Sequence, residues 1–122
     1  MNVSQPVLIG IIFVVLAAAA FILLTSGPSK YDDFAKCLSE KDAKMYGAFW
    51  CPHCKEQKAM FGSSWKYVNY VECSTPDGQG QLPVCTQAGV SGYPTWDFNG
   101  TRASGALALS ELSQKTGCPL PS

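Results

Sequence analysis

The chain has 122 residues, which is the length of one ordinary domain. Nine basic residues balance nine acidic ones, and this zero net charge argues against a nucleic-acid-binding surface built on bulk positive charge. All of these charged residues and all six cysteines follow residue 29, so the sequence divides into an apolar N-terminal part and a cysteine-rich remainder.

Residues 7–24 are an uninterrupted apolar run that contains no charged and no amide side chain. A helix of this length, at about 1.5 Å per residue, just crosses the hydrocarbon core of a bilayer. A cleaved signal peptide is the alternative, but it should begin with a basic region, and residues 1–5 contain no Lys or Arg. We therefore expect an uncleaved membrane anchor and a short linker over residues 1–29, in contact with membrane lipid, and a second domain over residues 30–122.

Two features disagree about which side of the membrane the second domain faces. Four lysines follow the span at positions 30, 36, 41 and 44, and basic residues next to a span favour the cytoplasm. That rule is weak for long translocated domains. Six cysteines in so small a domain favour an oxidising compartment. We therefore expect a single-pass protein of the cell membrane whose second domain is extracytoplasmic.

Hydrophobic periodicity and turn residues predict the remaining elements in chain order. We expect a helix at 31–40, a strand at 44–50, a helix at 52–61, a strand at 67–73, a polar loop at 74–81, a short helix at 84–88, strands at 95–98 and 101–104, and a closing helix at 108–116. Asn99-Gly100 joins the last two strands as a hairpin turn. This order predicts an α/β fold in which a mixed four-stranded sheet is flanked by helices.

The sequence Phe49-Trp50-Cys51-Pro52-His53-Cys54 stands where a predicted strand ends and a helix begins. Cys51 is therefore expected at the helix N-cap, with Pro52 at the first helical position, where its missing N–H costs nothing. The unpaired N–H groups and the positive end of the helix dipole favour an anion there, and a Cys51 thiolate is such an anion. We expect His53 to add to this stabilisation. Cys54, one turn later, is expected to be the buried resolving thiol.

Three other uses of this cysteine pair fit the sequence less well. A c-type haem site needs His directly after the second cysteine, and residue 55 is Lys. A structural zinc site needs four ligands, usually in two close pairs, whereas Cys73 and Cys85 are far apart in sequence. A Cys51–Cys54 bridge kept only for stability would close too small a loop to restrain the unfolded chain. We therefore expect thiol–disulfide chemistry, with no metal and no cofactor.

A second block, Gly92-Tyr93-Pro94-Thr95-Trp96, precedes the predicted hairpin. Together with the block at 46–54, with Tyr70-Val71-Glu72-Cys73 and with the order of elements, it resembles the thioredoxin-like superfamily. More narrowly, the sequence is similar to the thioredoxin-like domain fused to bacterial vitamin K epoxide reductase homologues. The resemblance runs from about residue 31 to residue 117, and three separated blocks agree with it in order and spacing.

The resemblance implies how a substrate would meet the site. It implies a cis Tyr93-Pro94 bond packed beside Cys51, with the Tyr93 backbone and Thr95 next to an extended substrate segment. Trp50 and Trp96 are candidates for lining a groove at the same place.

The resemblance also implies the reaction and its partners. Cys51 would exchange with a substrate through a mixed disulfide, and Cys54 would resolve it. Pro52-His53 between the cysteines is typical of strongly oxidising members, so we expect a disulfide oxidase acting on cysteine-containing exported proteins. The four-helix reductase is not in this sequence, so a vitamin K epoxide reductase-like membrane protein is expected to act in trans. A reductant or isomerase of the same fold, and a non-catalytic tethered binding module, are the alternatives.

One position departs from the superfamily pattern. Ordinary thioredoxins carry an acidic residue on the central strand behind the active-site pair, and Met45 stands near that place here. Proton transfer to or from Cys54 then needs another group or water. Glu72 is one candidate.

Four cysteines lie outside the active-site motif. Joining Cys73 to Cys85 would close the polar loop onto the sheet and stabilise the fold by about 3 kcal/mol in the chain-entropy model. Cys37 and Cys118 would then tie the two ends of the domain together. Four cysteines allow three connectivities, and we favour this one because both closures suit the fold. A relay role for Cys73 and Cys85 is the alternative, since strained or exposed disulfides are labile.

Overall fold

The computed structural model describes residues 3–25 and 28–122, with side chains at 3–22 and 28–122. Helix α1 (Gln5–Thr25) contains an 18-residue window, Gln5–Ile22, with a mean hydropathy of 2.5, and none of this window is buried against other described residues. By length and composition this helix is able to cross a membrane, and a signal sequence would pass the same test. The expected linker at 26–29 lies partly outside the described residues.

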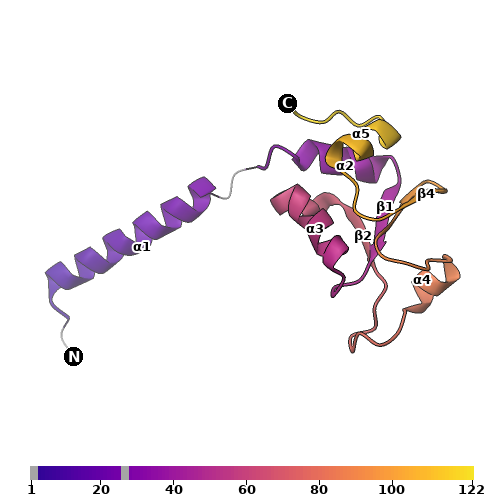
Figure 1. Ribbon diagram of the computed structural model, residues 1–122. Helices are drawn as coiled ribbons and strands as arrows, with labels where there is room; N and C mark the ends of the chain where they lie inside the picture. Colours follow the sequence, from indigo (N-terminus) through magenta and orange to yellow (C-terminus); the bar gives the residue numbers. More distant parts are fainter. Residues whose placement is uncertain (1–2, 26–27) are drawn as a thin grey trace.

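The rest of the chain alternates helices and strands (Figure 1). The elements are α2 (Asp32–Glu40), β1 (Ala43–Gly47), α3 (Pro52–Phe61), the 3-10 helix η1 (Gly62–Tyr67), β2 (Asn69–Glu72), α4 (Pro83–Gln87), β3 (Thr95–Phe98), β4 (Thr101–Ser104) and α5 (Leu109–Thr116). The four strands form one sheet in the order β2-β1-β3-β4, in which β1 is parallel to β2 and antiparallel to β3. The predicted mixed four-stranded sheet flanked by helices is confirmed.

Two predicted strands are shorter in the structure than in the sequence analysis. Strand β1 ends at Gly47 instead of residue 50, because the chain must turn before Cys51 begins α3. Strand β2 begins at Asn69 instead of residue 67, because η1 continues the chain from Gly62 to Tyr67. Both differences lie in the segments that connect α3 to the sheet. There the path that the chain must take outweighs the β propensity of the local sequence.

The core is formed where the helices pack on the sheet. Its largest fully buried apolar side chains come from α2, β1, α3, β3 and α5: Phe34, Leu38, Met45, Phe61, Trp96 and Leu112. The expectation that Trp96 lines a substrate groove is therefore wrong. Trp96 faces the core because it sits on the central part of β3, directly opposite Met45 of β1.

One polar side chain, Gln57 of α3, is buried within this core. Its Oε1 accepts hydrogen bonds from Trp96 Nε1 at 3.0 Å and from the Leu107 N–H at 2.7 Å. Its Nε2 donates to the Leu107 carbonyl at 3.0 Å. A buried amide with its groups satisfied avoids the penalty of desolvation. Gln57 thereby holds α3, which carries the active-site cysteines, against β3 and the segment before α5.

Two disulfides join segments at the periphery of the sheet. Cys37 of α2 pairs with Cys118 after α5, with a Cα–Cα distance of 5.8 Å, and Figure 1 shows these two helices side by side. Cys73 after β2 pairs with Cys85 of α4, with a Cα–Cα distance of 5.5 Å. The first bridge spans 81 positions, so in the chain-entropy model it stabilises the fold by about 4–5 kcal/mol.

The hairpin of β3 and β4 is held by one carboxylate. Asp97 Oδ1 accepts from the Gly100 N–H at 2.8 Å, and Oδ2 accepts from Arg102 Nε at 3.0 Å. The hydrogen bond from Gly100, aided by Arg102, lowers the pKa of Asp97 in the folded chain.

We predict that Asp97→Asn lowers the free energy of unfolding by about 1–2 kcal/mol at neutral pH. The pKa of Asp97 is lower in the folded chain than in the unfolded one, where it is about 3.9. The carboxylate therefore stabilises the fold fully above the unfolded value, and this stabilisation is lost as pH falls through the folded value. Denaturant unfolding of the wild type and the variant should show a difference that shrinks in acid. The exposed Asp33→Asn is the control, and a pH-independent difference for Asp97→Asn would contradict this account.

Candidate active site

The reactive thiol lies at the junction between β1 and α3. After β1 ends at Gly47, the chain turns, and the Cys51 N–H donates to the Ala48 carbonyl at 3.1 Å. Cys51 is the N-cap of α3, and its Sγ accepts a hydrogen bond from the Cys54 N–H at 3.3 Å. Pro52 follows in the first turn, where its lack of an N–H leaves no donor unsatisfied. The sulfur thus receives a helix donor that favours negative charge at this position.

The second wall of the site is the segment that precedes β3. The Tyr93-Pro94 peptide bond is cis, as the resemblance implies, and Pro94 is fully buried. The Tyr93 carbonyl lies 3.7 Å from Cys51 Sγ and accepts a hydrogen bond from the thiol. The buried Thr95 side chain donates to the Gly92 carbonyl at 2.7 Å. Thr95 therefore holds the turn that brings Tyr93 to Cys51.

Cys54 lies deeper in the protein than Cys51. Cys54 is fully buried, whereas Cys51 retains 5% of its exposure. Burial, together with the hydrogen bond to Cys51, raises the pKa of the Cys54 thiol to about 12. A Cβ at Gly47 would lie only 3.0 Å from Cys54 Sγ, so the glycine leaves the room that this sulfur occupies. Cys51 is thus the thiol that an external partner can reach, and Cys54 is placed to react with it from inside.

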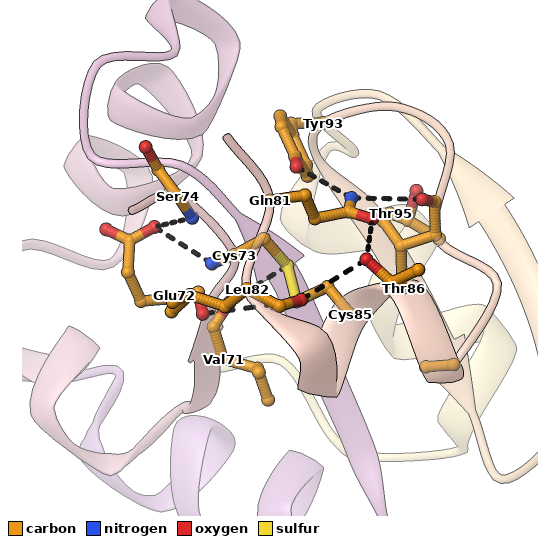
Figure 2. The surroundings of a disulfide bond; sticks show 12 residues. Val71, Glu72, Cys73, Ser74, Gln81, Leu82, Cys85, Thr86, Tyr93 and Thr95 are labelled. Atoms are coloured by element: carbon orange, nitrogen blue, oxygen red, sulfur yellow. Dashed lines mark hydrogen bonds between the residues drawn. A yellow bond between two sulfur atoms is a disulfide. The ribbon is translucent and has the colours of Figure 1, made fainter. Parts of the chain in front are cut away.

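The acidic residue proposed for proton transfer has other partners in the structure. Strand β1 carries the fully buried Met45 behind the cysteine pair. Glu72, at the end of β2, accepts from the Tyr70 hydroxyl at 3.2 Å, from the Cys73 N–H at 3.0 Å and from the Ser74 N–H at 3.2 Å. Figure 2 shows the two backbone contacts. The Glu72 carboxylate therefore fixes the start of the loop that follows β2.

His53 lies on the solvent side of α3. Its side chain is 68% exposed, and its Nδ1 lies 3.2 Å from a carboxylate oxygen of Glu56. The hydrogen-bond partners of Cys51 Sγ are instead the Cys54 N–H, which donates to it, and the Tyr93 carbonyl, which accepts from it. A protonated His53 would therefore act on Cys51 only through a charge interaction screened by solvent, and the Glu56 carboxylate would oppose it.

Two polar side chains of the loop after β2 hold the walls of the site. Trp50 is 47% exposed, and its Nε1 donates to Ser74 Oγ at 2.9 Å. Its ring meets the ring of Tyr93 edge-on at 6.0 Å. On the other side, Gln81 Nε2 donates to the Tyr93 hydroxyl at 2.7 Å (Figure 2). The same nitrogen donates to the Val90 carbonyl at 3.0 Å. One loop thus positions both the residue before Cys51 and the residue before the cis proline.

The Cys73–Cys85 disulfide closes this loop at its base. Both cysteines are fully buried, and the Leu82 N–H donates to the Cys73 carbonyl at 2.7 Å. Ser74 and Gln81 form an antiparallel bridge next to the disulfide. Burial shields the two sulfurs from external thiols, because exchange requires access to a sulfur. These contacts favour the structural interpretation of the pair over a relay.

Some of the residues that shape the site carry no signal in the sequence. Gly47 does carry a signal, because a glycine inside a predicted strand often marks a place where another part of the chain comes close to the backbone. Ser74, Gln81 and Gln57 have none, since their partners lie 24, 12 and 39–50 positions away. Within residues 3–25 and 28–122, no group of three or more His, Cys, Asp or Glu side chains is placed to hold a metal ion.

Comparison with known proteins supports this interpretation of the site. No family model matches the chain. It is 50% identical over 91 residues to thiol-disulfide oxidoreductase LTO1 of Arabidopsis thaliana, a match that covers 70% of this chain but only 24% of that protein. The chain thus spans about a quarter of that relative. It is 30% identical over 112 residues to protein disulfide-isomerase 5-1 of Arabidopsis thaliana, covering 81% of this chain and 71% of that one.

Comparison with solved structures gives a distant neighbour. Oxidized glutaredoxin 2 from Chlamydomonas reinhardtii superposes with a TM-score of 0.42 at 19% identity, over 74% of this chain and 95% of that one. The sequence relatives are disulfide-exchange proteins by name. The structure agrees with them, because a buried cysteine pair begins α3 and a cis proline lies beside it. The chain belongs to the thioredoxin-like thiol–disulfide oxidoreductases.

Proposed function

We propose that this chain is a membrane-anchored disulfide oxidase that donates its Cys51–Cys54 disulfide to exported proteins. The observation that carries the proposal is the position of Cys51 Sγ, which accepts the Cys54 N–H at the start of α3. This donor stabilises the thiolate of the reduced protein. Whatever stabilises the reduced form makes the disulfide a stronger oxidant.

The reaction consists of two exchange steps. A substrate thiolate attacks Cys51 Sγ, the Cys51–Cys54 bond breaks, and Cys54 leaves as a thiolate that takes up a proton. A second thiolate of the substrate then attacks the substrate sulfur of the mixed disulfide, and Cys51 leaves as a thiolate. The substrate is oxidised by two electrons, and the chain is reduced by the same two.

The surface around Cys51 suits an extended polypeptide. Within residues 28–122, the Tyr93 N–H donates no hydrogen bond, so it is available to a substrate carbonyl. Trp50 and Phe49 offer apolar surface next to the sulfur, at 47% and 46% exposure. A substrate strand that pairs with Tyr93 would place its cysteine over Cys51.

The anchor and the recharging partner belong to the same proposal. Helix α1 would hold the catalytic part close to the outer face of the membrane, because few residues separate α1 from α2. A vitamin K epoxide reductase-like membrane protein would accept the two electrons of the reduced pair and restore its disulfide. The resemblance to reductase-fused thioredoxin-like domains supports this partner.

An isomerase with the same site is the second candidate. The name of the relative that this chain matches over 71% of its length, a protein disulfide-isomerase, favours it. An isomerase must keep a reduced Cys51 in the presence of its substrates, so its disulfide has to be less oxidising than that of an oxidase.

We predict that Cys54→Ala traps mixed disulfides in cells. In this variant the Cys51 thiolate attacks a substrate disulfide, the other substrate sulfur leaves as a thiolate, and without Cys54 the adduct at Cys51 can no longer be released from inside. Alkylated extracts run under non-reducing conditions should show adducts that collapse on reduction. The Cys51→Ala, Cys54→Ala double variant is the matched control and should show none. A single variant as free of adducts as the double variant would indicate a binding module rather than an enzyme.

We predict that protease added to intact cells degrades the catalytic part while a cytosolic marker survives. An uncleaved α1 that places this part outside the cytoplasm leaves it open to attack. Immunodetection of the C-terminal residues before and after digestion measures this. Protection of the intact chain until the membrane is permeabilised would refute the proposed topology.

We predict that His53→Ser lowers the reduction potential of the pair by only about 5–20 mV, which equals roughly 0.2–1 kcal/mol for a two-electron couple. The effect is small because the side chain is exposed and paired with Glu56. Glu56→Gln should move the potential in the opposite direction, since it removes a negative charge from the same turn. The measurement is equilibration with glutathione. A large drop with His53→Ser, or equal signs for the two variants, would contradict this assignment.

A further inference from the structure

The exchange reaction requires a group that stabilises the Cys54 thiolate. Its sulfur becomes a thiolate when it leaves the disulfide, and again when it attacks a mixed disulfide at Cys51. Burial opposes that charge. Strand β1 offers no ionisable side chain on this side, because Met45 and Gly47 are what it brings next to the sulfur.

The ionisable groups that face Cys54 come from α3 and β2. From α3 they are Cys51 and Lys58, and from β2 the group is Tyr70. The point where a Cβ of Gly47 would stand is 3.0 Å from Cys54 Sγ and also 3.0 Å from the Tyr70 ring. The sulfur and the phenol ring therefore flank the same glycine.

Lys58 is held at this place by the Tyr70 ring. It follows Cys54 by one helical turn, so both side chains project from the same face of α3. Its Nζ lies 4.3 Å from the centroid of the Tyr70 ring and 5.9 Å from that of Trp65. Cation–π contacts of this kind restrain an ammonium group that would otherwise move freely in solvent.

Tyr70 itself is not suited to accept or carry the charge. Its hydroxyl donates to Glu72, whose carboxylate is also held by two backbone N–H groups. Burial and the nearby Glu72 raise the pKa of Tyr70 well above its usual range, so it stays a neutral phenol. Lys58 is a cation on the same face of α3 as Cys54, and its charge favours the thiolate there by lowering the pKa of the Cys54 thiol.

We propose that Lys58, seated on the Tyr70 ring, is a positioning residue that stabilises the Cys54 thiolate whenever Cys54 leaves or attacks Cys51. The proposal rests on thiol–disulfide exchange at this pair. In the attack, the Cys54 thiolate forms a bond to Cys51 Sγ, and the bond from Cys51 to the partner sulfur breaks. The partner leaves as a thiolate, and the proton lost from Cys54 goes to solvent.

The test separates the two cysteines in one reaction. The full chain in detergent, with only the Cys51–Cys54 pair reduced, is mixed with dithiobis-nitrobenzoate, a chromogenic disulfide. Attack by Cys51 releases one nitrothiobenzoate, and attack by Cys54 on the resulting mixed disulfide releases a second. Stopped-flow absorbance resolves a first phase that reports Cys51 and a second that reports Cys54.

Lys58→Met should slow the second phase by about three- to tenfold at neutral pH, equal to roughly half to one pKa unit for Cys54. Its pH profile should move upward by the same amount, while the first phase changes less than twofold. Lys58→Arg should restore the second phase, and the exposed Lys55→Met on the same helix should leave both phases unchanged. Tyr70→Phe keeps the ring and should also leave the second phase unchanged.

The outcomes that overturn the proposal are distinct. A Lys58→Met variant with an unaltered second phase and pH profile shows that Cys54 needs no cation from α3. Equal slowing of both phases shows a structural effect on the whole site, and slowing by Tyr70→Phe equal to that of Lys58→Met assigns the role to the hydroxyl. A wild-type chain that releases only one nitrothiobenzoate would refute exchange at the pair itself, and with it the proposed function.

Discussion

The hydrogen bond from the Cys54 N–H to Cys51 Sγ is the interaction on which the rest of the site depends. It exists because β1 stops at Gly47 and the chain turns through Ala48 into the first turn of α3. The same bond sets the division of labour between the two thiols. Cys51 stands at the helix terminus where a thiolate is favoured, whereas Cys54 lies in the interior, where burial keeps it protonated until it reacts.

The surrounding structure keeps that terminus in place from three directions. Gln57 ties α3 to β3 through the Trp96 indole. The cis Tyr93-Pro94 segment sets a carbonyl against Cys51 Sγ. The loop closed by the Cys73–Cys85 disulfide holds the two aromatic residues that border the sulfur. A site that exchanges disulfides needs such rigidity because its two sulfurs must approach each other in one defined geometry.

The sequence predicts those parts of the molecule that local patterns determine. Periodicity, the Asn99-Gly100 turn and the position of Pro52 were sufficient for the order of the α-helices and strands and for the N-cap of α3, whereas the 3-10 helix η1 was not predicted. The exact ends of β1 and β2 could not be predicted, because the segments that connect these strands to α3 determine them. The burial of Trp96 could not be predicted either, since it depends on which strand pairs with β3.

The contacts of the candidate site follow the same rule. Cys51 and Cys54 are only three positions apart at the start of α3, so their placement follows from helix geometry. The pairing of His53 with Glu56 is local, three positions apart on α3, but it depends on the direction of the side chains. The contact of Lys58 with Tyr70 joins α3 to a strand from elsewhere in the chain, and such a long-range contact carries no local signature.

The reduction potential of the Cys51–Cys54 pair tests the central claim most directly. The full chain is equilibrated with glutathione buffers, and its two thiols are counted by alkylation and mass. An N-cap that favours the thiolate predicts an oxidising potential, above the roughly −180 mV of isomerases and towards about −120 mV. A value near −270 mV, where reducing thioredoxins lie, would contradict the account, because the hydrogen bond at Cys51 would then not favour the reduced form enough to drive disulfide donation.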